Sequence, residues 1–173
     1  MALRLTSGPA VLPLTLAEAK DHLRVEHSDE DDLITRLIET ATRHVDGIDG
    51  ILGRACITQT WTLTLDAFPA AIILPLPPCQ SVDAITYIDT DGASQTLAVS
   101  GYQVTGIGGE ARVHPAFDTQ WPATRIVPEA VSVTFTAGYG DTGADVPAPI
   151  RSAILMHVAH LYEHRETVTA LGY

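Results

Sequence analysis

The stretch VSVTFTAGYGDTGADVPAPIRSAILMHVAHLYEHRE, residues 131–166, decides the fold because it predicts a strand, a glycine turn and a helix in succession. Val131, Val133 and Phe135 alternate with hydroxyl side chains, which is the period-two pattern of a strand with one buried face. Glycines then interrupt the strand, and from Pro147 onward the apolar residues recur at helical spacing. The stretch therefore predicts a strand that leads into a core-facing helix.

The predicted helix covers 147–166 and presents one apolar arc to the core. Prolines at its start cost little, because the first helical turn has no amide partners to lose. Arg165 in the last turn suits the negative end of the helix dipole. The arc consists of Ile150, Ile154, Leu155, Val158, Leu161 and Tyr162.

Residues 138–143, GYGDTG, match the GxGxxG pattern of dinucleotide-binding turns. That site needs a helix that opens within the glycines and a second parallel strand beyond it. Pro147 and Pro149 delay the helix here, and too little chain follows for another strand. We interpret the segment as a flexible turn between strand and helix.

His160, Glu163 and His164 match the HxxEH pattern of inverted zinc proteases. A zinc site needs a third protein ligand, and Glu166 is the sole carboxylate among the nine residues after His164. A zinc hydrolase therefore stays the least favoured alternative, and no cofactor or metal is expected. With His157, the two histidines form a stripe beside the apolar arc, where half-buried or interface histidines are common and a pH-sensitive contact stays open.

Length and composition predict one domain that needs no disulfide bonds or structural metal to fold. A chain of 173 residues buries enough surface to fold alone. Cys56 and Cys79 have no CxxC partner, so we expect buried free thiols in a reducing compartment, with a single disulfide less favoured. No apolar run is long enough to span a membrane. A formal net charge of -11, with Lys20 as the only lysine, argues against sequence-specific nucleic-acid binding.

The front of the chain predicts an irregular arm at 1–13 followed by a helical part at 15–53. Thr15 and Glu18 have the spacing of a capping box that starts a short helix. The acidic run 28–32 lacks the spacing of a calcium loop, so we interpret Ser28 as the cap of a second, longer helix. Its expected apolar face is Leu33, Ile34, Leu37, Ile38, Ala41, Val45, Ile48 and Leu52.

The middle, 57–137, predicts strands. Alternation from 57 to 65 gives a strand with Trp61 on its mainly apolar face. Residues 82–99 around Asp91-Gly92 predict one hairpin, and 102–114 predict another. The fold class is therefore α+β, with an N-terminal helix pair and a C-terminal helix packed with a central antiparallel β-sheet or small barrel. The residues 1–173 then form a single domain that ends in a tail, 167–173.

The two ends of the chain resemble the head-tail connector, or adaptor, proteins of tailed phages and phage-derived gene transfer agents. The resemblance rests on LTLAEAKDHLRVEHSDEDDLITRLIETA at the front and on AGYG, VPAPIRSAIL and LYEHRE at the back. The matching residues are Leu16, Glu18, Ala19, Lys20, Leu23, Asp32, Ile34, Gly138, Tyr139, Gly140, Pro147, Ala153, Tyr162, Arg165 and Glu166. Many relatives continue further after the Arg-Glu pair, whereas this sequence ends at Tyr173.

The resemblance implies a structural protein without catalysis. Such a subunit forms a homo-oligomeric ring that matches the portal's twelvefold symmetry and continues the DNA channel toward a tail-side stopper or tail terminator. The expected location is a virion or phage-like particle assembled in the bacterial cytoplasm. A β-sheet binding or tail accessory module is the alternative.

Two sets of site residues follow from the resemblance together with the side-chain pattern. The small or apolar side chains off the core arc of the last helix are expected to contact neighbouring subunits: Ser152, Met156 and Ala159. The tail is expected to contact the portal as an extended segment, since it carries β-branched residues and an aromatic end. Its candidate contact residues are Thr167, Val168, Thr169, Leu171 and Tyr173.

Overall fold

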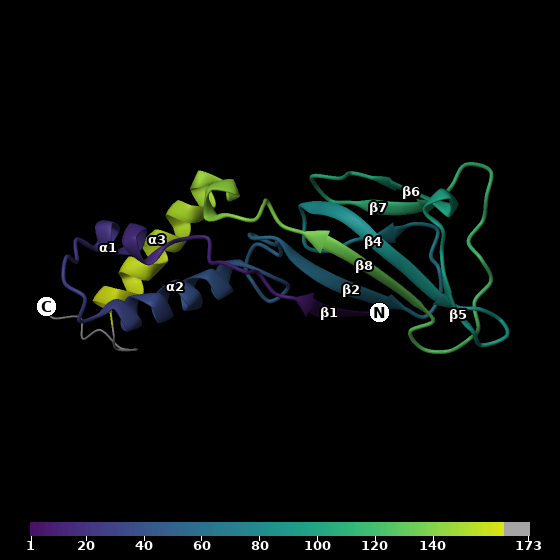
Figure 1. Ribbon diagram of the computed structural model, residues 1–173, viewed down its shortest axis with the longest axis horizontal. Helices are drawn as coiled ribbons and strands as arrows, with labels where there is room; N and C mark the ends of the chain where they lie inside the picture. Colours follow the sequence, from purple (N-terminus) through teal and green to yellow (C-terminus); the bar gives the residue numbers. More distant parts are fainter. Residues whose placement is uncertain (165–173) are drawn as a thin grey trace, which may run out of the picture.

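The computed structural model describes residues 1–164 of the chain. The molecule is elongated and has two lobes, with three helices at one end and the strands at the other (Figure 1). The chain crosses between the lobes three times, at 8–15, 46–58 and 138–147. We call this crossing region the waist. The α+β class expected from the sequence is confirmed.

The helical lobe contains α1 (Leu16–Leu23), α2 (Asp31–Val45) and α3 (Ala148–Glu163). The predicted capping box is confirmed, because Glu18 N donates to Thr15 Oγ1 while Thr15 N donates to Glu18 Oε2. None of these helices is long and apolar enough to cross a membrane. The predicted end of the C-terminal helix at Arg165 and Glu166 lies outside the described residues.

The predicted serine cap of α2 is wrong. Glu30 occupies the N-cap and makes no side-chain capping bond, while the Ser28 carbonyl accepts from the amide of Asp31 at 3.2 Å. This backbone hydrogen bond closes a turn over residues 28–31, and the helix begins at the end of that turn. Asp31 and Asp32 still place their carboxylates in the first turn, where the helix dipole favours negative charge.

The apolar face predicted for α2 is confirmed up to Val45 and wrong beyond it. Ile34, Ile38 and Ala41 are buried against α3 and α1. The helix ends at Val45, and Ile48 and Leu52 are 52% and 42% exposed. The reason is a turn at 46–54 that folds back against the end of the helix. Two backbone hydrogen bonds hold it there, from the Gly47 amide to the Arg54 carbonyl and from the Ile51 amide to the His44 carbonyl.

The larger sheet has five antiparallel strands in the order β1-β2-β8-β4-β5. They are β1 (Ala2–Ser7), β2 (Gln59–Leu65), β8 (Val131–Ala137), β4 (Cys79–Ile88) and β5 (Ser94–Thr96). The arm predicted as irregular at 1–13 is therefore a correction, since six of its residues form β1 along the edge of β2. Its pairing partner is some 60 residues away in sequence, so local signals gave no sign of it.

The smaller sheet has the order β3-β7-β6, with β3 (Ile72–Ile73), β7 (Arg112–Pro115) and β6 (Tyr102–Thr105). Both predicted hairpins are confirmed as β4-β5 and β6-β7. The β3 strand was not expected, because it is two residues long and lies in the proline-rich connection. Short 3₁₀ turns precede β6 and α3, at Val99–Gly101 and Gly143–Asp145.

The core of the β lobe contains the inward-facing side chains of both sheets. Val131, Val133 and Phe135 are fully buried, and Trp61 lies opposite Phe135 in the register of β2 and β8. The alternation predicted for β8 is thereby confirmed. Smaller side chains complete this core, among them Ala55 in the loop before β2 and Cys79 at the start of β4.

Both cysteines are buried and free, as predicted. Burial, together with the charge of Asp46, raises the pKa of Cys56 to about 12, so the thiol stays protonated at neutral pH. Burial also raises the pKa of Cys79. Neither sulfur has the thiolate character that reactive cysteines need.

The glycine segment is a turn between the lobes, as interpreted from the sequence. Gly138 has φ of 132°, and a Cβ there would lie 2.6 Å from the carbonyl oxygen of Ile57. The Gly138 amide donates to the Pro78 carbonyl at 2.9 Å, and the Thr58 amide donates to the Gly140 carbonyl at 2.9 Å. The second bond fastens two of the three waist crossings to each other, and the first fastens residue 138 to the chain just before β4, which fixes α3 relative to the sheet.

Candidate assembly surfaces

The outer face of α3 carries the predicted subunit contact. Ile154 and Val158 are fully buried against α2, which turns the opposite side of the helix outward. Ser152 is exposed, Met156 is 62% exposed, and Ala159 is partly exposed. The structure therefore brings the three residues to one surface, and their role as an interface stays a prediction.

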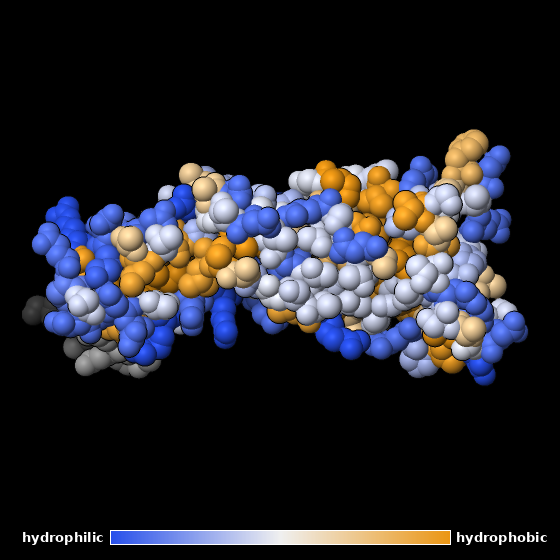
Figure 2. Space-filling view, in the orientation of Figure 1, coloured by the Kyte–Doolittle hydropathy of each residue, from blue (hydrophilic) through white to orange (hydrophobic). Residues whose placement is uncertain are grey.

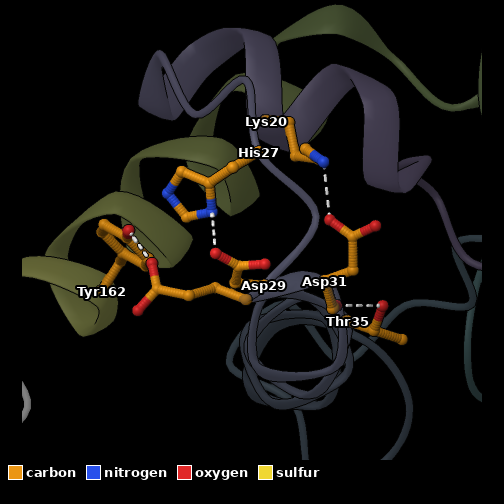
Figure 3. A network of polar contacts seen from close by, with 7 residues as sticks. Lys20, His27, Asp29, Asp31, Thr35 and Tyr162 are labelled. Atoms are coloured by element: carbon orange, nitrogen blue, oxygen red, sulfur yellow. Dashed lines mark hydrogen bonds and ion pairs between the residues drawn. The ribbon is translucent and has the colours of Figure 1, made fainter.

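Polar contacts at the outer end of the helical lobe connect α1, α2 and the last turn of α3 (Figure 3). Lys20 of α1 lies 2.6 Å from the Asp31 carboxylate of α2, and Tyr162 of α3 donates its hydroxyl proton to Glu30 just before α2. His27 lies 3.9 Å from Asp29 on the exposed rim. The network links all three helices, so this lobe presents its outer face as a rigid unit.

Arg151 adds a link from α3 to α1 near the waist. Its guanidinium donates to the carboxylate of Glu18, the residue that closes the capping box. Among residues 1–164 the buried Nε of Arg151 has no hydrogen-bond partner. The pair lies beside a depression of about 620 Å³ that 11–13 and 141–144 line together with it.

The three histidines of the predicted stripe, together with His44 of α2, form two ring contacts on the helical lobe. The ring centroids of His160 and His164 are 4.7 Å apart, and those of His44 and His157 are 4.9 Å apart. Burial, followed by the charges of His44 and His160, lowers the pKa of His157 below its ordinary value. Within the described part of the chain no group of three or more His, Cys, Asp or Glu side chains is placed to hold a metal ion.

A groove of about 640 Å³ lies at the waist, between the edge of the sheet and the end of α2. Sequence analysis did not find it, because its lining comes from three separate segments of the chain, 5–12, 39–49 and 59–61. The lining is mainly apolar at its floor and charged at its rim: Leu5, Pro9, Leu12, Glu39, Thr42, Arg43, Asp46, Gly47, Ile48, Asp49, Gln59 and Trp61. We call it the waist groove.

Exposed apolar side chains also gather elsewhere on the surface. The space-filling view shows them in one band over the helical lobe and in another over the small sheet (Figure 2). Large apolar side chains on the β lobe that face solvent include Ile73, Val99, Ile107, Phe117 and Ile126. Exposed apolar surface that gathers in bands is typical of sites where other proteins bind.

The predicted portal contact lies outside the described residues. Thr167, Val168, Thr169, Leu171 and Tyr173 all belong to the segment after residue 164. Their role therefore stays a prediction from the sequence.

The fold and the surfaces define a class of protein: a two-lobed α+β protein that exposes apolar side chains and whose described residues form no metal-holding cluster. Residues 13–104, more than half of the chain, match the family model of the Phage gp6-like head-tail connector protein. The chain belongs to this family, and its role is that of a structural head-tail connector. Curated protein sequences contain no match to it.

Solved structures of gene transfer agent (GTA) particles contain chains with the same fold. A chain in the neck of an empty GTA particle, computed with C6 symmetry, matches with a TM-score of 0.80 and 24% identity, covering 100% of this chain and 89% of that one. A chain in the virion of a native GTA particle matches at 0.78 and 25% identity, covering 99% and 89%. A chain in the neck of a native GTA particle, computed with C12 symmetry, matches at 0.72 and 23%, covering 99% and 88%.

Proposed function

We propose that this chain forms a ring between the portal and the tail of a phage or phage-like particle and continues the DNA channel there. The observation that carries the proposal is membership of the connector family together with a match over the whole described fold to chains of GTA necks. The sixfold and twelvefold symmetries of those necks support a rotationally symmetric ring, and we propose twelve subunits.

The ring acts without catalysis in this proposal. The described residues offer surfaces and a rigid helical lobe, and the buried thiols have raised pKa values that suit structural cysteines. Family and fold both belong to structural components of particles. We place assembly of the particle in the bacterial cytoplasm, before release.

The partners follow from the position in the neck. We propose that the face of Ser152, Met156 and Ala159 packs against neighbouring subunits, where small side chains allow close approach of helices. We propose further that 167–173 contacts the portal and that a stopper or tail terminator binds on the other side of the ring. The β-branched residues of the tail support an extended contact along a strand edge.

The experiment is a reconstitution with the portal protein of the same particle. The wild-type chain and a chain that lacks 167–173 are each mixed with portal rings, and the masses of the complexes are measured. We expect a complex with twelve copies for the wild type and loss of portal binding for the truncation, with the same melting temperature for both free proteins. Absence of any portal complex with the wild type contradicts the proposal, and normal binding by the truncation removes the tail from it.

A further inference from the structure

The waist groove has the features of a seat for a protein segment. Leu5 and Ile48 leave about half of their side-chain surface exposed at its sides, and Trp61 closes its floor. Thr42 lines the groove and is 6% exposed, and its buried hydroxyl has no hydrogen-bond partner among the described residues.

The turn between β6 and β7, residues 106–111, exposes an apolar side chain that suits the apolar lining of the waist groove. Ile107 at its tip is 52% exposed. Gly106 has φ of 77°, and a Cβ there would lie 2.3 Å from the Glu110 carbonyl oxygen, so the turn is closed tightly. The Gly108 amide donates to the Cys79 carbonyl at 2.8 Å, and the Cys79 amide donates to the Gly109 carbonyl at 3.0 Å. We call the exposed Ile107 side chain the knob. These bonds within the subunit hold it in place without a partner.

The groove and the turn lie at the same height along the molecule, on opposite edges of the large sheet. Gln59 in the groove pairs with Ala137, and Ala137 pairs with Cys79, to which the turn is bonded. The strand β1 borders the groove, whereas the turn lies beyond β4, where β5 does not extend because it pairs only with Thr86–Ile88. Figure 1 shows the β6-β7 turn on the waist side of the β lobe, across the sheet from β1.

We propose that the Ile107 turn of one subunit inserts into the waist groove of the next subunit. The inference rests on the proposed ring and names the contact that closes it. A ring needs two different complementary surfaces on each subunit, and side-by-side packing brings surfaces of equal height together. Ile107 then meets Leu5, Ile48 and Trp61.

Charges at the edges of the two surfaces fit this pairing. The rim of the groove carries the carboxylates of Glu39, Asp46 and Asp49 and the guanidinium of Arg43. Glu110 in the turn and Arg112 at the start of β7 have side chains that are 59% and 50% exposed, and Arg112 donates to the Glu110 carboxylate at 3.5 Å. In the proposed contact this pair exchanges its internal bond for the rim of the groove, with Arg112 facing the carboxylates and Glu110 facing Arg43.

The test uses one variant for each surface and a matched control. Ile107→Asp destroys the knob, Ile48→Asp destroys the groove, and Val99→Asp places the same charge on an exposed apolar residue at the other end of β6. Each variant is mixed with portal rings, and the bound copies are counted by mass. We expect full rings for the control and at least a tenfold loss of ring formation for the other two, with unchanged melting temperatures of the free chains.

A mixture of the two defective chains distinguishes a directional contact from general surface damage. The Ile48→Asp chain keeps its knob and the Ile107→Asp chain keeps its groove, so an equimolar mixture should form one-to-one dimers and nothing larger. Rings of normal size from the Ile107→Asp chain would overturn the proposal. Dimers of either variant alone would also overturn it, because they require a different contact.

Cross-linking in the assembled neck supplies the position directly. With cysteines at both 48 and 107, a short bismaleimide should link subunits into a ladder that ends at the full ring, whereas either cysteine alone should give no ladder. No ladder in necks that contain the chain overturns the contact and leaves the connector function intact. Absence of the wild-type chain from purified necks contradicts the connector function itself.

Discussion

Arg151 in α3 donates a hydrogen bond to Glu18 in α1, and the same carboxylate accepts the backbone amide of Thr15 that precedes the helix. These bonds join the start of the first helix to the last helix across the lobe. The Thr15 amide, then the Thr15 hydroxyl and the charge of Arg151, lower the pKa of Glu18 although partial burial opposes this. The Glu18 side chain therefore makes these bonds as an ionised carboxylate at neutral pH.

Thr15→Ala should lower the free energy of unfolding by about 1 kcal/mol, the usual loss for an N-cap hydroxyl. The hydroxyl accepts the Glu18 amide at 3.2 Å in the native helix, and alanine leaves that amide to water. Urea unfolding measures the change. Thr90→Ala, in the exposed turn between β4 and β5, is the control and should shift stability by less than about 0.5 kcal/mol. Equal shifts for the two would show that the cap contributes nothing.

Lowering the pH from 7 to 5 should destabilise the protein partly through His157. Its pKa in the folded state lies below the ordinary value of about 6.5, so the unfolded chain binds the proton more readily. Stability is therefore full above that value and falls as the pH drops below it. His157→Gln should flatten the dependence of the melting temperature on pH, and His44→Gln should flatten it less, by removing one repelling charge. An unchanged slope in His157→Gln would contradict the burial of this ring.

Ile154→Ala should cost about 2–5 kcal/mol, because the side chain is fully buried between the helices and its loss leaves a cavity. Met156→Ala, two residues away on the solvent side of the same helix, is the matched control and should cost less than about 0.5 kcal/mol. Guanidinium unfolding of both variants gives the comparison. Similar losses would mean that α3 is rotated from the orientation described.

Ala159→Glu should block ring formation on the portal and leave the monomer folded. A carboxylate buried without a partner at a subunit seam costs several kcal/mol. Met156→Glu tests the same face at a more exposed position, and Ser100→Glu near the start of β6 is the control. Mass measurement of portal complexes, with circular dichroism of the free chains, separates assembly from folding. Full rings from both face variants would show that this face of α3 meets solvent.

The free chain should not bind duplex DNA at physiological salt. The chain has a formal net charge of -11, and counterion release rewards only basic contacts. In the proposed channel this repulsion keeps DNA from adhering. A mobility assay with a duplex of arbitrary sequence measures it, and retention of the duplex at about 0.15 M salt would contradict the proposed role of the acidic residues.

Elements with strong local signals were predictable from the sequence. The alternation around Phe135 and the helical spacing around Ile154 survive in the structure, because each pattern reflects burial of one face. The capping box at Thr15 and the hairpin turn at Asp91-Gly92 also depend on neighbouring residues alone. The order of motifs at both ends was enough to indicate the connector family.

Other features depended on partners far away in the sequence. The β1 strand exists because Leu5 lies opposite Trp61, and no local rule relates these positions. The apolar face predicted beyond Val45 was wrong because backbone bonds to the returning loop compete with further helical turns, and the exposure of Ile48 follows from that ending.

The sequence by itself determined the fold class, the buried faces of β2, β8 and α3, and the family. Only the tertiary structure decided which surfaces lie side by side. The waist groove combines β1, β2, α2 and the loop after it, and the Ile107 turn is placed opposite by its bonds to Cys79. The physical reason is that periodicity reports whether a side chain is buried, whereas the position of one surface relative to another depends on strand order and register, which long-range pairing sets.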